Sequence, residues 1–179
     1  LFNLFVAFTK KNYYKVYSCH GSFIIIGNEA LKSLNPPFQS SMFLFNDLLQ
    51  GGLGEGDFGL IFGNPGGGKS WTLIALGAHA VQLGFNVVHY TLELGESYVG
   101  RRYDACLTGI PVNNIMNFKD QVEKEILELP GNLVIKEYSP GKASISTIES
   151  HIQKCIDLDF KPDLIIIDYV DLLRSKRNN

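Results

Sequence analysis

The stretch Gly63-Asn64-Pro65-Gly66-Gly67-Gly68-Lys69-Ser70 decides the fold of this 179-residue chain. It matches the pattern G-x-x-x-x-G-K-[ST] at every defined position, and this pattern is typical of loops that bind phosphate. Glycines let the backbone wrap closely around phosphate oxygens, and the N-terminus of the following helix adds partial positive charge. We therefore predict an ATP site in which Lys69 reaches the β- and γ-phosphates and Ser70 supplies a hydroxyl to Mg²⁺.

The segments on either side favour a phosphate loop over a chance glycine-rich turn. The apolar run 58–62 before the loop indicates a buried strand, and residues 69–83 after it have helical composition. Trp71 directly follows the loop and is counted with it. The predicted nucleotide-binding residues are Gly63, Asn64, Pro65, Gly66, Gly67, Gly68, Lys69, Ser70 and Trp71.

Strands and helices alternate along the rest of the chain, which predicts an α/β fold with a mostly parallel sheet flanked by helices. The expected strands are 58–62, 86–92, 133–136 and 164–167. The expected helices are 43–50, 69–83, 97–107, 119–129, and one that runs from a capping box at Ser146-Thr147-Ile148-Glu149 towards Leu158.

Two carboxylates stand at the ends of apolar strands, where ligands bind in open parallel sheets. Asp168 follows Leu164-Ile165-Ile166-Ile167, and a carboxylate there can hold Mg²⁺ together with Ser70. Such a strand end is common on its own, and the upstream phosphate loop is what favours the metal role. Glu93 ends another apolar strand and is the candidate general base, catalytic together with Lys69. Glu96 competes for that role, but it lies further into the loop.

Four other polar residues carry weaker signals. Arg101 and Arg102 follow Glu93 on an expected helix, where they form either a solvated basic face or a contact to phosphate or to another subunit. His89 lies within a strand, and no metal-ligand spacing links it to another histidine. Asp171 follows Asp168 closely and could add polar contacts near the metal.

Composition excludes several classes of protein. Hydrophobic residues make up 45% and charged residues 19%, which is typical of a globular chain rather than a disordered one. The formal net charge of -2 provides no global basic field for nucleic acid. The three cysteines are isolated, so neither a disulfide framework nor a zinc site is expected. No apolar run reaches the roughly 18 residues that span a bilayer, so we expect no membrane association and a cytoplasmic location, or the host cytoplasm if the protein is viral.

Several segments, in the correct order, resemble the RecA-like core of DnaB-type hexameric replicative DNA helicases, particularly their phage and virus relatives. The resemblance covers roughly residues 40–174 and is carried by Gly52-Leu53-Gly54-Glu55-Gly56-Asp57, Tyr90-Thr91-Leu92-Glu93, Arg101-Arg102-Tyr103-Asp104-Ala105 and Ile166-Ile167-Asp168-Tyr169-Val170-Asp171-Leu172-Leu173.

The resemblance implies a RecA-like P-loop NTPase that hydrolyses ATP and moves on single-stranded DNA during DNA replication. It implies that Lys69 and Ser70 bind phosphate and Mg²⁺, that Glu93 is the catalytic base and that Asp168 is the Walker-B carboxylate. The implied partners are single-stranded DNA, further copies of the chain in a homo-hexamer, and primase with other replisome proteins. The alternatives are a RecA- or KaiC-like ATPase of recombination or regulation, and a remnant that binds nucleotide without turnover.

The domain organisation is expected to be incomplete. Residues 1–40 show no steady pattern and receive no function, although Phe23–Ile26 could form a strand. Residues 41–179 are assigned to the RecA-like ATPase core, which stops soon after the strand of Asp168. By resemblance, the sensor, the DNA-binding loops and the arginine finger follow that point, so we expect a fragment that is poorly active by itself.

Overall fold

The computed structural model describes residues 2–7, 14–19, 22–27, 58–63 and 66–174, and it describes side chains within 58–61 and 66–174. The expected helix 43–50, the turn 54–57 and the loop residues Asn64 and Pro65 lie outside the described residues. The assignment of 41–179 to one ATPase core remains a prediction.

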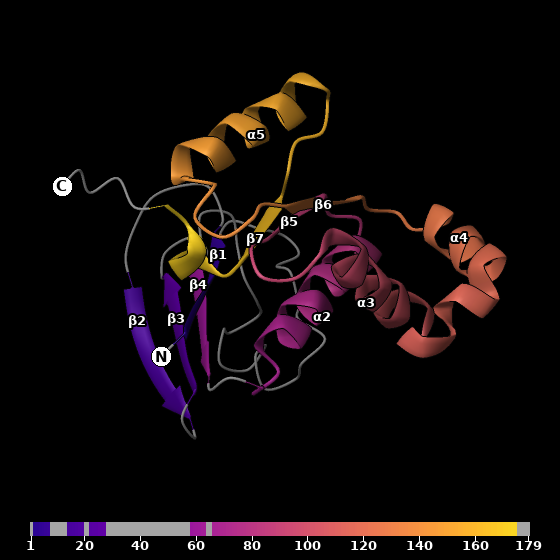
Figure 1. Ribbon diagram of the computed structural model, residues 1–179, viewed down its shortest axis with the longest axis horizontal. Helices are drawn as coiled ribbons and strands as arrows, with labels where there is room; N and C mark the ends of the chain where they lie inside the picture. The colour runs from indigo at the N-terminus through magenta and orange to yellow at the C-terminus, as the bar shows by residue number, and fades with distance from the viewer. Residues whose placement is uncertain (1, 8–13, 20–21, 28–57, 64–65, 175–179) are drawn as a thin grey trace.

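One sheet runs through the described part of the chain, with the strand order β2-β3-β4-β1-β7-β5-β6 (Figure 1). Its strands are β1 Phe2–Ala7, β2 Tyr14–Cys19, β3 Ser22–Gly27, β4 Phe58–Gly63, β5 Val87–Thr91, β6 Leu133–Glu137 and β7 Leu164–Asp168. The four strands predicted from apolar runs after residue 57 are confirmed as β4, β5, β6 and β7, and Phe23–Ile26 lies within β3.

The strands that carry the predicted site residues all run in one direction. Strand β5 pairs in parallel with both β6 and β7. Strand β1 pairs antiparallel with β4 on one side and β7 on the other, so β4 and β7 run the same way. The carboxyl ends of β4, β5 and β7 therefore meet at one edge of the sheet. The insertion of β1 between β4 and β7 was not predicted.

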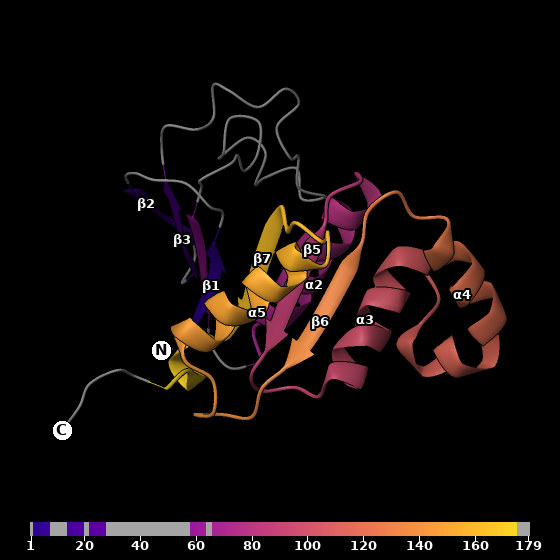
Figure 2. The same ribbon diagram turned by 90° about the horizontal axis from the view of Figure 1, so that it is seen from above.

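Helices cover both faces of β5 and β7, as the α/β prediction requires. The helices in the described part of the chain are α2 Lys69–Gln82, α3 Glu96–Thr108, α4 Lys119–Leu127 and α5 Ile145–Asp157, with the short 3-10 helices η2 Val112–Phe118 and η3 Val170–Leu172. Figures 1 and 2 place α5 on one side of these strands and α2 with α3 on the other.

Alternation along the strands explains the two covered faces, because successive strand residues point to opposite sides of a sheet. Val87 and Ile166 pack against α2 through Leu73. Val88 and Ile165 face the other way and pack around Ile148 of α5. These runs read as continuously apolar in the sequence because both faces are buried.

The helix ends agree with the sequence except at α5. Leu83 is the C-cap of α2, and Gly84 follows with φ 92, the left-handed conformation expected of a glycine stop. The predicted capping box at Ser146–Glu149 is wrong. Ser144 caps α5 instead: its hydroxyl accepts from the Thr147 amide at 3.3 Å, and the Thr147 hydroxyl accepts from the Ser144 amide at 3.1 Å. A threonine thus takes the place of the expected glutamate.

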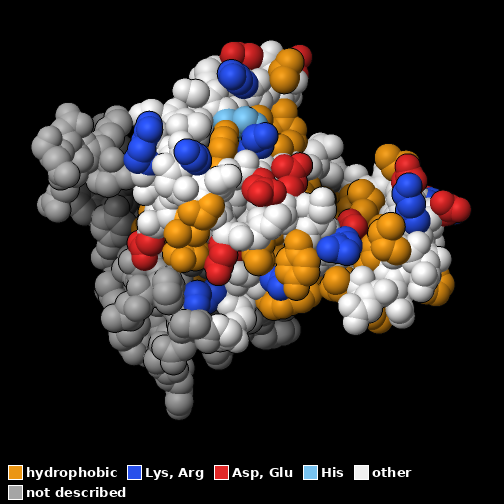
Figure 3. All heavy atoms as spheres, in the orientation of Figure 1, with side chains coloured by type: hydrophobic (Ala, Val, Ile, Leu, Met, Phe, Trp, Pro, Cys, Tyr) orange, Lys and Arg blue, Asp and Glu red, His pale blue; other side chains and the backbone are white. Residues whose placement is uncertain are grey.

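The surface mixes charges of both signs over the face that Figure 3 shows. Large apolar side chains are exposed on η2 and α4, where Met116 is 69% and Leu127 is 79% accessible. Among the described residues, none of the helices combines the length and the apolar character that a membrane crossing would need.

Candidate nucleotide-binding site

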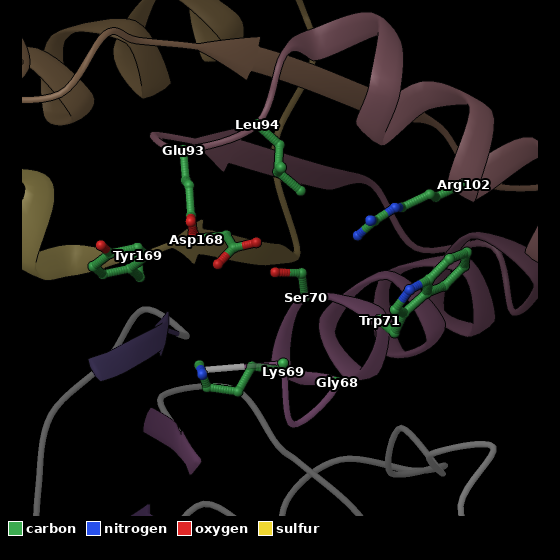
Figure 4. A pocket seen from close by; sticks show the side chains of 10 residues that line it. Gly68, Lys69, Ser70, Trp71, Glu93, Leu94, Arg102, Asp168 and Tyr169 are labelled. Carbon is green, nitrogen blue, oxygen red and sulfur yellow. The ribbon is translucent and has the colours of Figure 1, made fainter. Parts of the chain in front are cut away.

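A cavity of about 460 Å³ opens at the sheet edge where β4, β5 and β7 end (Figure 4). Four predicted residues, Lys69, Ser70, Glu93 and Asp168, line it together although they come from three separate segments. The full lining consists of Gly66, Gly68, Lys69, Ser70, Trp71, Glu93, Leu94, Arg102, Asp168 and Tyr169.

The phosphate loop owes its shape to glycines in the left-handed conformation. Gly66 has φ 75 and Gly68 has φ 83, values that residues other than glycine rarely adopt. A Cβ at either position would meet nothing within 4 Å, so the requirement is conformational rather than steric. Gly68 is also the N-cap of α2, and its carbonyl accepts from the Thr72 amide at 2.9 Å.

The N-terminus of α2 suits an anion. Its first turn contains no acidic residue, and Gly68 at the N-cap provides no side-chain cap. Amide groups at a helix start that lack such caps are the usual partners of a phosphate, and the helix dipole adds to the attraction. Lys69 and Ser70 stand in that first turn and bring a cation and a hydroxyl to the cavity.

Asp168 is the buried carboxylate of the site. It ends β7, is 2% exposed and is hydrogen-bonded to the Ser70 side chain. Burial raises the pKa of Asp168, and the nearby Glu93 carboxylate raises it further. The Ser70 hydrogen bond and the charges of Lys69 and Arg102 act in the opposite direction.

This pair of oxygens fits Mg²⁺. The ion prefers hard oxygen ligands, typically one or two from the protein, with water and phosphate completing the octahedron. Ser70 and Asp168 provide a hydroxyl and a carboxylate already in contact with each other. A divalent cation beside Asp168 would also offset the cost of burying its charge.

Glu93 lies just beyond the end of β5 and its side chain is exposed to the cavity (Figure 4). The strand register sets Thr91 opposite Asp168, and the Leu92 amide donates to the Asp168 carbonyl at 2.7 Å. A tight turn follows, because the Thr91 hydroxyl donates to the Leu94 carbonyl at 2.7 Å. Glu93 is therefore held beside Asp168 by backbone pairing.

Glu96, the competing carboxylate, lies elsewhere. It begins α3, and its amide donates to the Glu137 carboxylate at 2.9 Å at the end of β6. Its own carboxylate accepts from the Glu137 amide at 3.4 Å. Glu96 does not line the cavity, so the geometry favours Glu93, as strand-end placement predicted.

The structure distinguishes Arg102 from Arg101, whose roles the sequence left open. It lines the cavity, whereas Arg101 is exposed outside it. The Arg102 guanidinium lies over the ring of Trp71 at 4.6 Å and over the ring of Tyr98 at 4.4 Å. Tyr98 and Arg102 are one helical turn apart, which the sequence could have revealed. The contact with Trp71 joins two helices and has no local signature.

Other candidate residues are placed away from the chemistry. Asp171 is exposed in η3 and does not line the cavity. His89 is fully buried, and its Nδ1 lies 2.8 Å from the Tyr103 hydroxyl, as expected of a packed histidine rather than a ligand.

Two further glycines of the predicted loop are also placed. Gly63 ends β4, and Gly67 is exposed in the loop between Gly66 and Gly68. Leu94 and Tyr169 line the cavity but were not predicted.

Comparison with known proteins agrees with the fold. The AAA domain family matches residues 44–179, which is most of the chain. The chain belongs to the AAA domain family. The match begins before the phosphate loop and continues past Asp168, so it contains every residue that lines the cavity. The predicted α/β P-loop NTPase fold is confirmed.

This AAA domain is also similar to a DnaB-like replicative helicase of Enterobacteria phage T4. The two are 28% identical over 155 residues, a match that covers 82% of this chain and 32% of the phage protein. The chain therefore corresponds to about a third of that relative's length. The resemblance to DnaB-type helicases is confirmed, and both comparisons support an ATPase of the helicase type.

Proposed function

We propose that this AAA domain binds ATP with Mg²⁺ and hydrolyses it as the motor of a replicative DNA helicase that moves on single-stranded DNA. The observation that carries the proposal is the convergence of Lys69, Ser70, Glu93 and Asp168 on one cavity. These residues provide a cation that binds the phosphates, two metal ligands and a base, which together make up a phosphoryl-transfer site.

In the proposed reaction, the loop amides and Lys69 hold the β- and γ-phosphates. Ser70 and Asp168 would hold the metal, which would neutralise negative charge on the phosphates. Glu93 orients a water molecule and accepts its proton while the water oxygen bonds to the γ-phosphorus. The bond between that phosphorus and the bridging oxygen breaks, so ADP and phosphate leave.

The electrostatics of the cavity agree with these roles. Asp168 is shielded from solvent, and a neighbouring hydroxyl and two cations favour its charged form against the effects of burial and of Glu93, as a fixed metal ligand requires. Glu93 is exposed to the cavity and can reach water. Two carboxylates side by side thus occupy different environments, a division that separates metal binding from proton transfer.

The DNA-dependent part of the proposal is supported by the DnaB-like helicase of phage T4 and by the sequence motifs shared with DnaB-type helicases. We propose single-stranded DNA as the track, a homo-hexamer as the working assembly, and primase and other replisome proteins as partners. The proposed location is the cytoplasm, or the host cytoplasm if the protein is viral.

The test is the ATPase rate of the full-length gene product with and without single-stranded DNA. We expect DNA to raise the rate, and the same protein to unwind a forked duplex in the presence of ATP. ATP hydrolysis that DNA does not change, with no unwinding, would contradict the helicase proposal and favour a regulatory ATPase of the KaiC type. DNA strand exchange without unwinding would favour a recombinase.

A further inference from the structure

Arg102 is held by contacts from two helices. From its own helix α3, Tyr98 presents its ring at 4.4 Å and accepts a hydrogen bond from Nη2 at 3.1 Å. From α2, Trp71 presents its indole ring at 4.6 Å. We call Trp71 and Tyr98 the aromatic clamp. In Figure 4 the guanidinium extends from α3 past Trp71 towards Ser70.

Burial does not explain the two rings of the aromatic clamp. Trp71 is 43% exposed and Tyr98 is 41% exposed, so neither belongs to the hydrophobic core. A planar guanidinium stacks well on aromatic faces, and it is desolvated more easily than an ammonium group. The long arginine side chain has many rotamers, and two rings with one hydrogen bond restrict it to a small part of that range.

The Arg102 guanidinium lies in the cavity where the proposed reaction develops negative charge on the phosphates. Arg102 lines the same cavity as Lys69 and Ser70, and its Nε is buried without a hydrogen-bond partner in the described structure. A cation fixed before the reaction stabilises developing negative charge without the cost of reorganisation.

We propose that Trp71 and Tyr98 are positioning residues that fix the Arg102 guanidinium in the nucleotide cavity, where it faces the phosphates of bound ATP. This inference rests on the proposed ATPase function and deepens it. Because Trp71 directly follows Ser70 in the first turn of α2, the aromatic clamp is attached to the phosphate loop itself. Nucleotide binding at that loop and the position of Arg102 are therefore coupled.

The test measures kcat and KM for ATP in the full-length gene product. Trp71→Leu, Tyr98→Ala and Arg102→Lys are each expected to lower kcat roughly tenfold, with KM within about threefold of the wild-type value. Trp71→Phe and Tyr98→Phe keep an aromatic ring and should stay within about threefold of the wild-type kcat. In an Arg102→Gln background, Trp71→Leu should lower kcat little further, because the ring acts through the guanidinium.

Two control variants isolate the aromatic clamp from general surface effects. Lys124→Gln removes an exposed cation outside the cavity, and Phe118→Ala removes an exposed ring outside the cavity. Both should keep the wild-type kcat. Arg102→Gln and the addition of MgADP should each change the part of the intrinsic fluorescence that is lost in Trp71→Phe.

The outcomes separate this inference from the proposed function. If wild-type protein shows no hydrolysis that depends on Lys69, both are overturned. If hydrolysis depends on Lys69 but Trp71→Leu, Tyr98→Ala and Arg102→Lys all keep the wild-type kcat, only the inference about the aromatic clamp is overturned. An equal loss of kcat from Trp71→Leu in the wild-type and Arg102→Gln backgrounds would also overturn it. A loss confined to the DNA-stimulated rate would overturn it too and would assign the two rings to DNA binding. Should Trp71→Leu fail to fold, Tyr98→Ala and Arg102→Lys still decide.

Discussion

Ser70, in the first turn of α2, is hydrogen-bonded to Asp168 at the end of β7. The phosphate loop and the buried carboxylate are thereby joined. The contact requires β4 and β7 to end at the same edge of the sheet, which their shared antiparallel pairing with β1 ensures. Ser70 and Asp168 thus form the preorganised pair of oxygen groups that we propose as metal ligands.

Replacing Asp168 with asparagine should weaken the Mg²⁺ dependence of nucleotide binding. The amide keeps the size of the carboxylate and can still accept from Ser70, but it carries no charge for the ion. We expect MgADP affinity to fall about 10- to 100-fold while metal-free ADP affinity changes little. Isothermal calorimetry with MgADP and with ADP plus EDTA measures both. Asp171→Asn, an exposed carboxylate outside the cavity, is the matched control. Wild-type MgADP affinity in Asp168→Asn would remove Asp168 from the metal site.

Replacing Glu93 with glutamine should separate binding from hydrolysis. The side chain keeps its size and loses the ability to accept a proton, so we expect kcat to fall about 100-fold or more with nucleotide affinity nearly unchanged. Phosphate release by the full-length gene product measures the rate. Glu96→Gln is the control, because Glu96 lies outside the cavity and pairs with Glu137. A Glu93→Gln protein that hydrolyses ATP at the wild-type rate would exclude Glu93 as the base.

Gly77 in α2 should be intolerant of any side chain. A Cβ there would overlap the Tyr103 hydroxyl and press on Ile166 Cδ1 at 3.0 Å, at the packed junction of α2, α3 and β7. We expect Gly77→Ala to lower the free energy of unfolding by about 1–3 kcal/mol through overpacking. Gly100→Ala is the control, since its Cβ would meet only Ile135 Cδ1 at 3.8 Å and should be neutral or stabilising. Equal stability of the two variants in urea would contradict this packing.

His89 should make the protein less stable in acid. Burial lowers the pKa of His89 from 6.5 to about 3. Below pH 6.5 the unfolded chain takes up a proton that the folded chain does not, so stability falls as the pH falls towards 3. The loss amounts to at most about 5 kcal/mol over that window. His89→Gln should flatten the dependence, as urea unfolding between pH 7 and pH 4.5 would show. Parallel pH profiles for the two proteins would contradict this account.

The parts of the fold that could be predicted are those with local signatures. The phosphate loop and the strand leading to Asp168 follow from residue type and spacing, because glycine conformation and continuous burial act within a few residues. Strand β1 could not be placed between β4 and β7, since its pairing depends on chain segments far apart in sequence. The cap of α5 was misplaced because Thr147 fulfils a role that the pattern assigns to glutamate.

The same distinction, between features with a local signature and features set by distant segments, applies to the candidate site. The sequence could place Glu93 and Asp168 close together, because strand ends converge at one edge of a parallel sheet. Arg102 was left undecided, because the helix pattern gave no indication of which arginine, 101 or 102, would face the cavity. The packing of α3 on α2 decides it, and that packing depends on Tyr103 and Val99 meeting Ile74 in the core.

The measurement that tests the central claim most directly is MgATP affinity of Lys69→Ala beside Lys161→Ala. Lys69 lines the cavity in the first turn of α2, whereas Lys161 is an exposed lysine outside that lining. We expect wild-type protein and Lys161→Ala to bind MgATP equally, and Lys69→Ala to lose about 100-fold or more because the phosphates lose their main side-chain cation. Unchanged MgATP affinity in Lys69→Ala would contradict the assignment of this cavity as the nucleotide site.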